Sequence, residues 1–363
     1  MLNSACVYLG LMILMVLLLY STHHQKNKLL GAFLASAAFA IVFGIRWMVG
    51  TDFEAYLNGY EIACVGMMDT IDSWEIGFRY IFIVCSKYNC HYSIPFGIIA
   101  FLQVYFLFIG LYKYSNVWIS LTLTLMLSCI WLSYSNIMRH MLAFSIFVYS
   151  IQFLANKQYI KYVASIFMAT LCHSTAIILL IFPIIYKFRE YFFSKVWAQL
   201  ILLTLSLILM NVNVVQTVFE KISPIVTLMG YDHYIESRFA GFDEEATFGL
   251  ARLTILIINI ILICYSNKTK EFYKSKRVAI IYDLYFIGVL VHYAFFRMFL
   301  IQRLDYYFLS FDFIFGAFTL YSLLEKRKYL IYSALIILYI IIFFVKMRVA
   351  EDITAAYSTF FSK

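Results

Sequence analysis

The chain has 363 residues, of which 64% are hydrophobic and only 13% are charged, and its net charge is +8. Soluble domains carry about 25% charged residues, so this composition predicts a polytopic membrane protein and excludes a soluble globular domain. The basic residues lie mostly in short loops between apolar runs, where they set topology. We therefore expect no nucleic-acid partner. The seven cysteines lack metal-binding spacing and are expected to pack as small apolar residues.

Ten apolar segments approach the length of about 20 residues that a membrane-spanning helix needs. They are Leu2–Tyr20, Leu29–Ile45, Ser93–Tyr112, Val117–Tyr134, Met138–Ala155, Val196–Val212, Phe248–Tyr265, Val278–Phe296, Leu304–Leu324 and Tyr329–Val345. The segment Tyr159–Tyr186 is too long for one simple span, and we expect it to turn back near His173. The segment Trp74–Tyr88 is amphipathic, so we expect it to lie at the membrane interface or to re-enter.

The positive-inside rule places the basic loops together on the cytoplasmic side, which predicts about twelve crossings with both termini outside. The outer side then holds two larger loops, at about residues 46–92 and 213–247. We expect an all-α integral membrane protein with one transmembrane domain over residues 1–363, whose chemistry faces outward.

Six arginines depart from the positive-inside pattern, because they fall at the expected outer ends of helices or in the outer loops. They are Arg46, Arg139, Arg238, Arg252, Arg297 and Arg303. The arginine side chain is suited to bidentate recognition of phosphate, so this group predicts a site for a lipid pyrophosphate. Each arginine taken alone also fits a snorkelling residue or a structural ion pair.

Candidates for proton transfer lie on the same side of the predicted membrane. His173 occurs in "LCHSTA" and Asp52 in "GTDFEAY", while His140 follows Arg139 directly. Histidine can act as a general base near neutral pH. The alternatives are a packing role for each histidine and helix capping for Asp52.

Further polar residues divide between the predicted site and structural roles. Asp232 and His233 lie in the second outer loop and join the predicted substrate-binding set. His91 and His292 are expected only to pack, and Asp283 and Asp312 to form ion pairs. The sequence contains no HExxH, DxD, P-loop or GxSxG motif, so we expect neither a metal nor a cofactor.

Several short motifs resemble the EpsG-like branch of the Wzy-type polysaccharide polymerases. "R-x3-G-T-D-x3-Y" begins at Arg46 and is followed by "E-x-G-F" at Glu75; "R-H-x-L-A" begins at Arg139, and "C-H-S-T-A" follows about thirty residues later. The order of these motifs and their hydropathy context extend over most of the chain. The family usually shows Arg-Gln where this chain has Arg139-His140, which weakens a catalytic assignment for His140 but not for Arg139.

The resemblance implies a helical membrane fold related to the GT-C type. It also implies polymerisation of undecaprenyl-pyrophosphate-linked oligosaccharide at the outer face of the bacterial inner membrane, in lipopolysaccharide or related polysaccharide biosynthesis. Arginines would then stabilise the leaving pyrophosphate, and His173 or Asp52 would accept the acceptor proton. The expected partners are the lipid-linked oligosaccharide as donor and acceptor, the bilayer, and a chain-length regulator protein. A flippase or transporter of the same lipid, an O-antigen ligase and, more distantly, a membrane acyltransferase are the alternatives.

Overall fold

The computed structural model describes residues 2–24, 27–67, 69–187, 195–210, 249–350, 356–359 and 361. These residues are helical and contain no β-strand, apart from an isolated bridge between Arg46 and Thr359. The all-α prediction is therefore confirmed for the described part of the chain. Helix is the expected solution for apolar segments, since a membrane offers the backbone no other hydrogen-bond partner.

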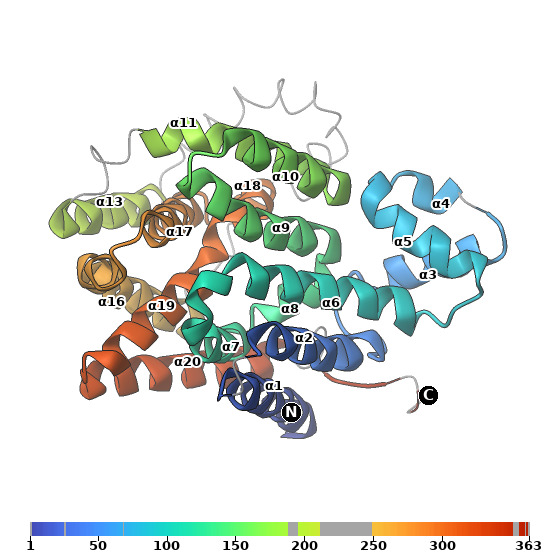
Figure 1. Ribbon diagram of the computed structural model, residues 1–363, viewed down its shortest axis with the longest axis horizontal. Coiled ribbons are helices and arrows are strands. Elements are labelled where there is room, and N and C mark those ends of the chain that lie inside the picture. The colour runs from blue at the N-terminus through green and yellow to red at the C-terminus, as the bar shows by residue number, and fades with distance from the viewer. Residues whose placement is uncertain are drawn as a thin grey trace. The chain divides into compact units, whose positions relative to one another are not determined.

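Figure 1 shows the helices in chain order. The first half contains α1 (Leu2–His24), α2 (Lys28–Gly44), α3 (Phe53–Cys64), α4 (Asp69–Asp72), α5 (Ile76–Lys87), α6 (Ser93–Gly110), the 3₁₀ helix η1 (Tyr112–Val117), α7 (Trp118–Leu127), α8 (Trp131–Asn136) and α9 (Met138–Ala155). The second half contains α10 (Tyr159–Cys172), the 3₁₀ helix η2 (Ser174–Ile181), α11 (Phe182–Lys187), α13 (Val196–Leu209), α16 (Leu250–Tyr273), α17 (Lys276–Ala294), α18 (Phe299–Leu309), α19 (Phe311–Glu325) and α20 (Tyr329–Ala350).

Seven helical stretches of the described chain are long and apolar enough to cross a membrane. They are Asn3–Thr22, Ser93–Gly110, Met138–Ala155, Leu250–Tyr273, Lys276–Ala294, Ile301–Glu325 and Tyr329–Val349. Four shorter apolar helices accompany them, at Lys28–Gly44, Tyr159–Cys172, Ser174–Lys187 and Val196–Leu209. The chain is thus a membrane-embedded protein, while the predicted number of about twelve crossings is not reached by the long helices alone.

One predicted span is interrupted. Within Val117–Tyr134 the chain forms α7 and α8, with Cys129 between them in a left-handed conformation at φ 59°. Each of these helices is short, ten and six residues, and a helix rises only about 1.5 Å per residue. Neither is long enough to cross a bilayer about 30 Å thick by itself.

The segment Tyr159–Tyr186 turns back at His173, as its length predicted. The α10 helix ends at Cys172, His173 is extended (φ −156°, ψ 119°), and η2 follows. The Tyr162 hydroxyl, in the first turn of α10, donates to the Leu179 carbonyl near the end of η2, at 2.7 Å. The two helices therefore lie side by side, and the turn exposes His173 at their joined ends.

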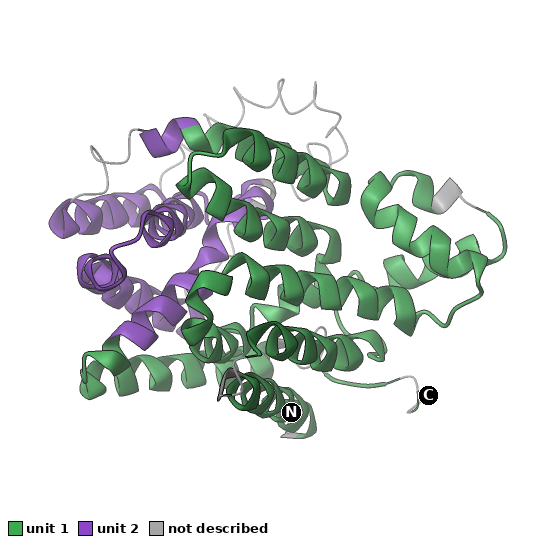
Figure 2. Cartoon of the chain, in the orientation of Figure 1, with its two compact units in different colours: residues 1–183, 323–363 green, residues 184–322 purple. Residues whose placement is uncertain are grey.

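The described residues form two compact units, at 1–183 with 323–363 and at 184–322 (Figure 2). In the first unit α1, α2, α6, α9 and α10 pack successively against one another (Figure 1). The predicted outer loop at residues 46–92 is largely helical, because it folds into α3, α4 and α5. The predicted loop at 213–247 lies outside the described residues.

The helices α3 and α5 are held together by an aromatic core. Phe53, Tyr56, Phe78 and Phe82 are buried in one cluster that also includes Phe96 of α6. The Phe78 ring lies 5.7 Å from the Tyr56 ring and 5.0 Å from the Phe82 ring. Such aromatic pairs stabilise a core beyond the area they bury. The cluster also includes Met138 of α9, and α5 separately contacts α10, so the start of α5, where Glu75 stands, is held near both helices.

Candidate active site

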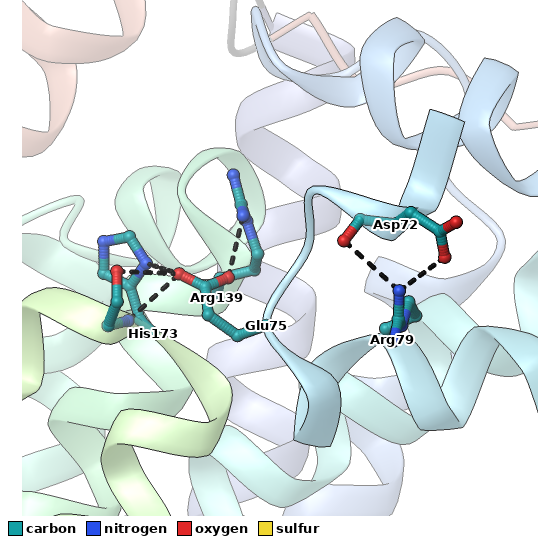
Figure 3. Close-up of polar contacts among 6 residues, drawn as sticks. Asp72, Glu75, Arg79, Arg139 and His173 are labelled. Atoms are coloured by element: carbon teal, nitrogen blue, oxygen red, sulfur yellow. Dashed lines mark hydrogen bonds and ion pairs between the residues drawn. The ribbon is translucent and has the colours of Figure 1, made fainter. Parts of the chain in front are cut away.

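A carboxylate, a histidine and an arginine from three separate segments converge in the first unit (Figure 3). Glu75 directly precedes α5, Arg139 lies in the first turn of α9, and His173 lies in the turn between α10 and η2. Glu75 Oε2 accepts a hydrogen bond from Arg139 Nη1 at 2.8 Å, and Glu75 Oε1 lies 2.8 Å from His173 Nδ1. Glu75 is therefore the centre of the cluster.

The turn at His173 adds two more hydrogen bonds to the same carboxylate. The backbone N–H of Ser174 donates to Glu75 Oε1 at 3.0 Å, and the Ser174 hydroxyl donates to it at 3.3 Å. Since Ser174 is the first residue of η2, the carboxylate also satisfies a backbone donor that the helix start leaves open. Glu75 thereby fixes both the side chain and the backbone of the turn.

Glu75 is held in its ionised form. Burial acts to raise the pKa of its carboxyl, but the hydrogen bond from His173, the charge of Arg139 and the Ser174 N–H outweigh this and lower the pKa. A lowered carboxyl pKa contributes stability that is fully present above the unfolded-state value of about 4.3 and is lost as the pH falls through the lowered pKa. The Glu75–Arg139 ion pair therefore persists at neutral and mildly acidic pH.

The ionised Glu75 determines how His173 presents its two ring nitrogens. An ionised carboxylate accepts a hydrogen bond only from a nitrogen that carries a proton. In the neutral imidazole, Nδ1 therefore carries the proton and Nε2 is the hydrogen-bond acceptor. Nε2 has no hydrogen bond to any residue in the described part of the chain, and the side chain is 22% exposed. This is the arrangement of a general base whose orientation a carboxylate fixes.

Arg139 lies between Glu75 and Tyr56 of α3. The buried Tyr56 hydroxyl lies beside the guanidinium; burial raises the pKa of Tyr56, and Arg139 opposes that rise. Arg139 Nε is buried and has no hydrogen-bond partner among the described residues. Since a guanidinium carries five N–H donors and the Arg139 side chain is 28% exposed, Arg139 keeps donors for a ligand beyond those that Glu75 and Tyr56 occupy.

Gly77 explains how α5 comes so close to the end of α10. A Cβ atom at Gly77 would lie 2.8 Å from the Leu171 carbonyl oxygen and 3.0 Å from the Leu171 Cβ. Any larger residue would push the helices apart and draw Glu75 away from His173. In the motif "E-x-G-F", Glu75 thus supplies the carboxylate, Gly77 the close approach, and Phe78 the buried core.

The residues around Asp52, which directly precede α3, also lie close to Tyr56. Gly50 has a φ of +97°, which favours glycine. Asn136 Oδ1 accepts from the Asp52 backbone N–H at 2.8 Å and from the Thr51 hydroxyl at 3.0 Å. Asp52 directly precedes α3, but its side chain makes no capping hydrogen bond. The Asp52 carboxylate is near enough to raise the pKa of Tyr56. The two predicted bases, Asp52 and His173, therefore both border the group formed by Glu75, Arg139 and Tyr56.

Arg46 has internal partners in this structure. Its side chain is 1% exposed and donates to the backbone carbonyls of Phe43, Val49 and Ser135. It also lies over the rings of Phe53 and Phe96, with 5.5 and 5.2 Å to the ring centroids. These contacts join α2, α6 and α8, and they hold Arg46 inside the protein.

The other predicted site residues divide between the two units. His140 is buried in the first unit, and its ring centroid lies 5.2 Å from that of His173. Arg252, Arg297 and Arg303 belong to the second unit, where Arg252 lies over the Phe296 ring at 4.2 Å. Arg238, Asp232 and His233 lie outside the described residues. Among the described residues, no group of three or more His, Cys, Asp or Glu side chains could hold a metal ion.

Glu75 is the candidate site residue that the sequence prediction missed. It appeared in the sequence only as part of a motif and of an amphipathic segment, about 60 residues from Arg139 and 100 from His173. The available signal was a carboxylate two residues before a glycine, at the start of a helix on the predicted outer side. Nothing in the spacing tied it to either partner.

Comparison with known proteins bears on the same motifs. Residues 29–361, nearly the whole chain, match the EpsG family. The chain belongs to the EpsG family. No curated protein and no solved structure matches it. This membership associates the chain with polysaccharide biosynthesis and polymerase-type glycosyltransferases, and the match includes all three segments that meet at Glu75.

Proposed function

We propose that this EpsG family protein is a polysaccharide polymerase. It transfers a growing glycan from undecaprenyl pyrophosphate to a hydroxyl of a lipid-linked repeat unit, at the periplasmic face of the bacterial inner membrane. The observation that carries the proposal is the Glu75–His173–Arg139 cluster, which combines an oriented base with a cation that has unused donors. A base can take the proton of the acceptor hydroxyl, and a cation can stabilise the departing pyrophosphate.

The residues would share the reaction as follows. The acceptor hydroxyl attacks the anomeric carbon of the donor sugar, a C–O bond forms, and the bond from that carbon to the pyrophosphate oxygen breaks. His173 Nε2 takes the hydroxyl proton, and Glu75 stabilises the imidazolium that results. Arg139 stabilises the charge that develops on the departing undecaprenyl pyrophosphate. The proton transfer and the departure of the pyrophosphate both need a site from which bulk water is largely excluded. The cluster suits this need, because Glu75 is only 14% exposed.

A deletion strain tests the function against its alternatives. Loss of the long polysaccharide ladder, with one repeat still attached to its acceptor, is expected for a polymerase. Complete loss of attached repeats would instead indicate a flippase or a ligase. The measurement is gel analysis of the lipopolysaccharide, with the wild-type gene restored on a plasmid as the control.

The proposed orientation is tested at Asn58, an exposed residue of α3. The positive-inside rule places this helix in the periplasm. We expect a cysteine at position 58 to react with a membrane-impermeant thiol reagent in intact spheroplasts, after removal of the native cysteines. Reaction only after the membrane is permeabilised would reverse the orientation and the mechanism with it.

Replacement of Arg139 by lysine tests the clamp. Lysine keeps the charge, but its single ammonium cannot reach Glu75, Tyr56 and a pyrophosphate together as a guanidinium can. A hydrogen bond to a charged group contributes about 1.5–3 kcal/mol, so we expect a loss of roughly 10–100-fold in polymerisation rate. The rate is measured with purified lipid-linked repeat in detergent.

Arg79→Lys is the matched control, because Arg79 forms an ion pair with Asp72 that is more exposed, with 58% of the Asp72 side chain accessible. Exposed pairs contribute little, so this variant should polymerise at the wild-type rate. Equal rates in the two lysine variants, at equal protein levels, would remove Arg139 from the pyrophosphate site.

A further inference from the structure

A second carboxylate–histidine pair lies in the second unit. Asp305 of α18 is 1% exposed at its side chain, and its Oδ2 lies 3.4 Å from Nδ1 of His292, in the last turn of α17. Neither Asp305 oxygen has a hydrogen bond to any described residue. A buried carboxylate with so little compensation is costly, so its presence calls for an explanation beyond helix packing.

The packing of α17 against α18 fixes this pair. A Cβ at Gly288 would lie 2.3 Å from the Leu309 nitrogen, so the two backbones touch at that point. One turn closer to the connection between the helices, four residues after Gly288 and four before Leu309, His292 faces Asp305. The sequence analysis expects this connection on the outer side of the membrane. The pair therefore occupies a defined position, one turn in from that surface.

The pair is similar in placement to Glu75 and His173, although its 3.4 Å separation is longer than the 2.8 Å hydrogen bond between Glu75 and His173. In both, the carboxylate faces Nδ1 of the histidine and is well buried, while the imidazole is 22–23% exposed. His292 Nε2 has no hydrogen bond to any residue that the structure describes. The rings of Tyr293 and Phe296 lie 5.5 and 6.0 Å from the His292 ring. An oriented nitrogen acceptor beside aromatic rings is suited to a hydroxyl-rich ligand, because sugars present both hydroxyl donors and apolar C–H faces.

We infer that His292 and Asp305 form a second site, which binds a sugar hydroxyl of the glycan substrate. Asp305, which lies 3.4 Å from Nδ1, favours the tautomer in which Nδ1 carries the proton, and Nε2 then accepts the hydrogen bond from the hydroxyl. The site binds the sugar without forming or breaking a covalent bond, and it thus differs from the role proposed for His173. The identification of the ligand as a glycan rests on the proposed function.

Footprinting of the purified full-length wild-type protein tests this inference. Diethyl pyrocarbonate modifies the unprotonated, accessible nitrogen of histidine, and mass spectrometry locates the product. We expect His292 to be modified, and we expect added lipid-linked repeat to slow its modification. His91 is exposed and bonded to Ser93, so its modification rate should not change and serves as the internal control.

Kinetics provide a second measurement. We expect His292→Gln to raise KM for the lipid-linked repeat about 10-fold, the cost of one lost hydrogen bond, with kcat little changed. His91→Gln should leave both constants unchanged. A purely structural contact would alter protein yield or thermal stability without separating KM from kcat.

The outcomes separate the inference from the proposed function. Protection of His173 but not of His292 would overturn the inference and leave the polymerase proposal intact. Protection of His292 in a protein that forms no polymer would support the sugar site and contradict the polymerase. If His292 is unreactive, or is modified at equal rates with and without the lipid-linked repeat, the pair is only a contact between helices. This test uses the wild-type protein, so it holds even if His292→Gln fails to fold.

Discussion

Replacement of Glu75 by glutamine is expected to reduce polymerisation by about 10²–10⁴-fold, because it removes the group that orients the base and pairs with Arg139. The amide keeps the size of the side chain but carries no charge. Its single oxygen can accept a hydrogen bond from His173 or from Arg139, but not from both. Its NH₂ group would then face the N–H donor of the other residue and repel it. The imidazolium formed during the reaction would also lose its counter-charge.

The same substitution should lower stability. Removing one partner of a buried ion pair costs about 3–5 kcal/mol when the remaining charge is fully buried. Arg139 is 28% exposed, so solvent reduces the loss, and we expect about 2 kcal/mol or less. The measurements are the initial rate with purified lipid-linked repeat and the thermal unfolding midpoint in detergent.

Asp72→Asn is the control for Glu75→Gln, since Asp72 is a nearby carboxylate that also pairs with an arginine but is exposed. It should be close to wild type in both measurements. Glu75→Asp keeps the charge, but its shorter side chain cannot reach both His173 and Arg139. Its rate should fall between those of Asp72→Asn and Glu75→Gln. A wild-type rate in Glu75→Gln would show that the cluster is structural only.

His173→Ala is expected to cut turnover by about 10²–10⁴-fold while leaving donor binding largely intact, as loss of a general base does. The physical reason is that Nε2 is the acceptor in the tautomer that Glu75 selects. Donor binding should persist because Arg139 remains paired with Glu75. The readouts are initial rate and donor affinity, with His91→Ala as the control for loss of an exposed histidine.

Asp52→Asn is the competing test, because only one of the two residues should behave as the base. Asp52 is held through its backbone N–H by Asn136, so the amide should leave the fold intact. A full loss in Asp52→Asn with less than about tenfold loss in His173→Ala would transfer the role to Asp52. If neither matters, the acceptor proton leaves to water and arginine electrostatics carry the catalysis.

Hydrophobic periodicity and length determined much of the architecture without tertiary information. The membrane class, the helical fold and the positions of most long helices follow from them, because an apolar segment in a bilayer must satisfy its own backbone. The length of Tyr159–Tyr186 also predicted the turn at His173, since one span cannot hold so many apolar residues. The positions of Arg139 and His173 as site candidates came from the sequence as well.

Tertiary structure alone decided which polar groups meet. Glu75 joins Arg139 and His173 because Gly77 lets α5 touch α10 and because an aromatic core fixes α3 against α5. The same packing buries Arg46 among carbonyl oxygens, although its sequence context matched that of a phosphate ligand. His292 gained a carboxylate partner for a similar reason, the close contact of α17 and α18 at Gly288. Periodicity shows which residues share one helix face, but partners on different helices depend on crossing points that it does not encode.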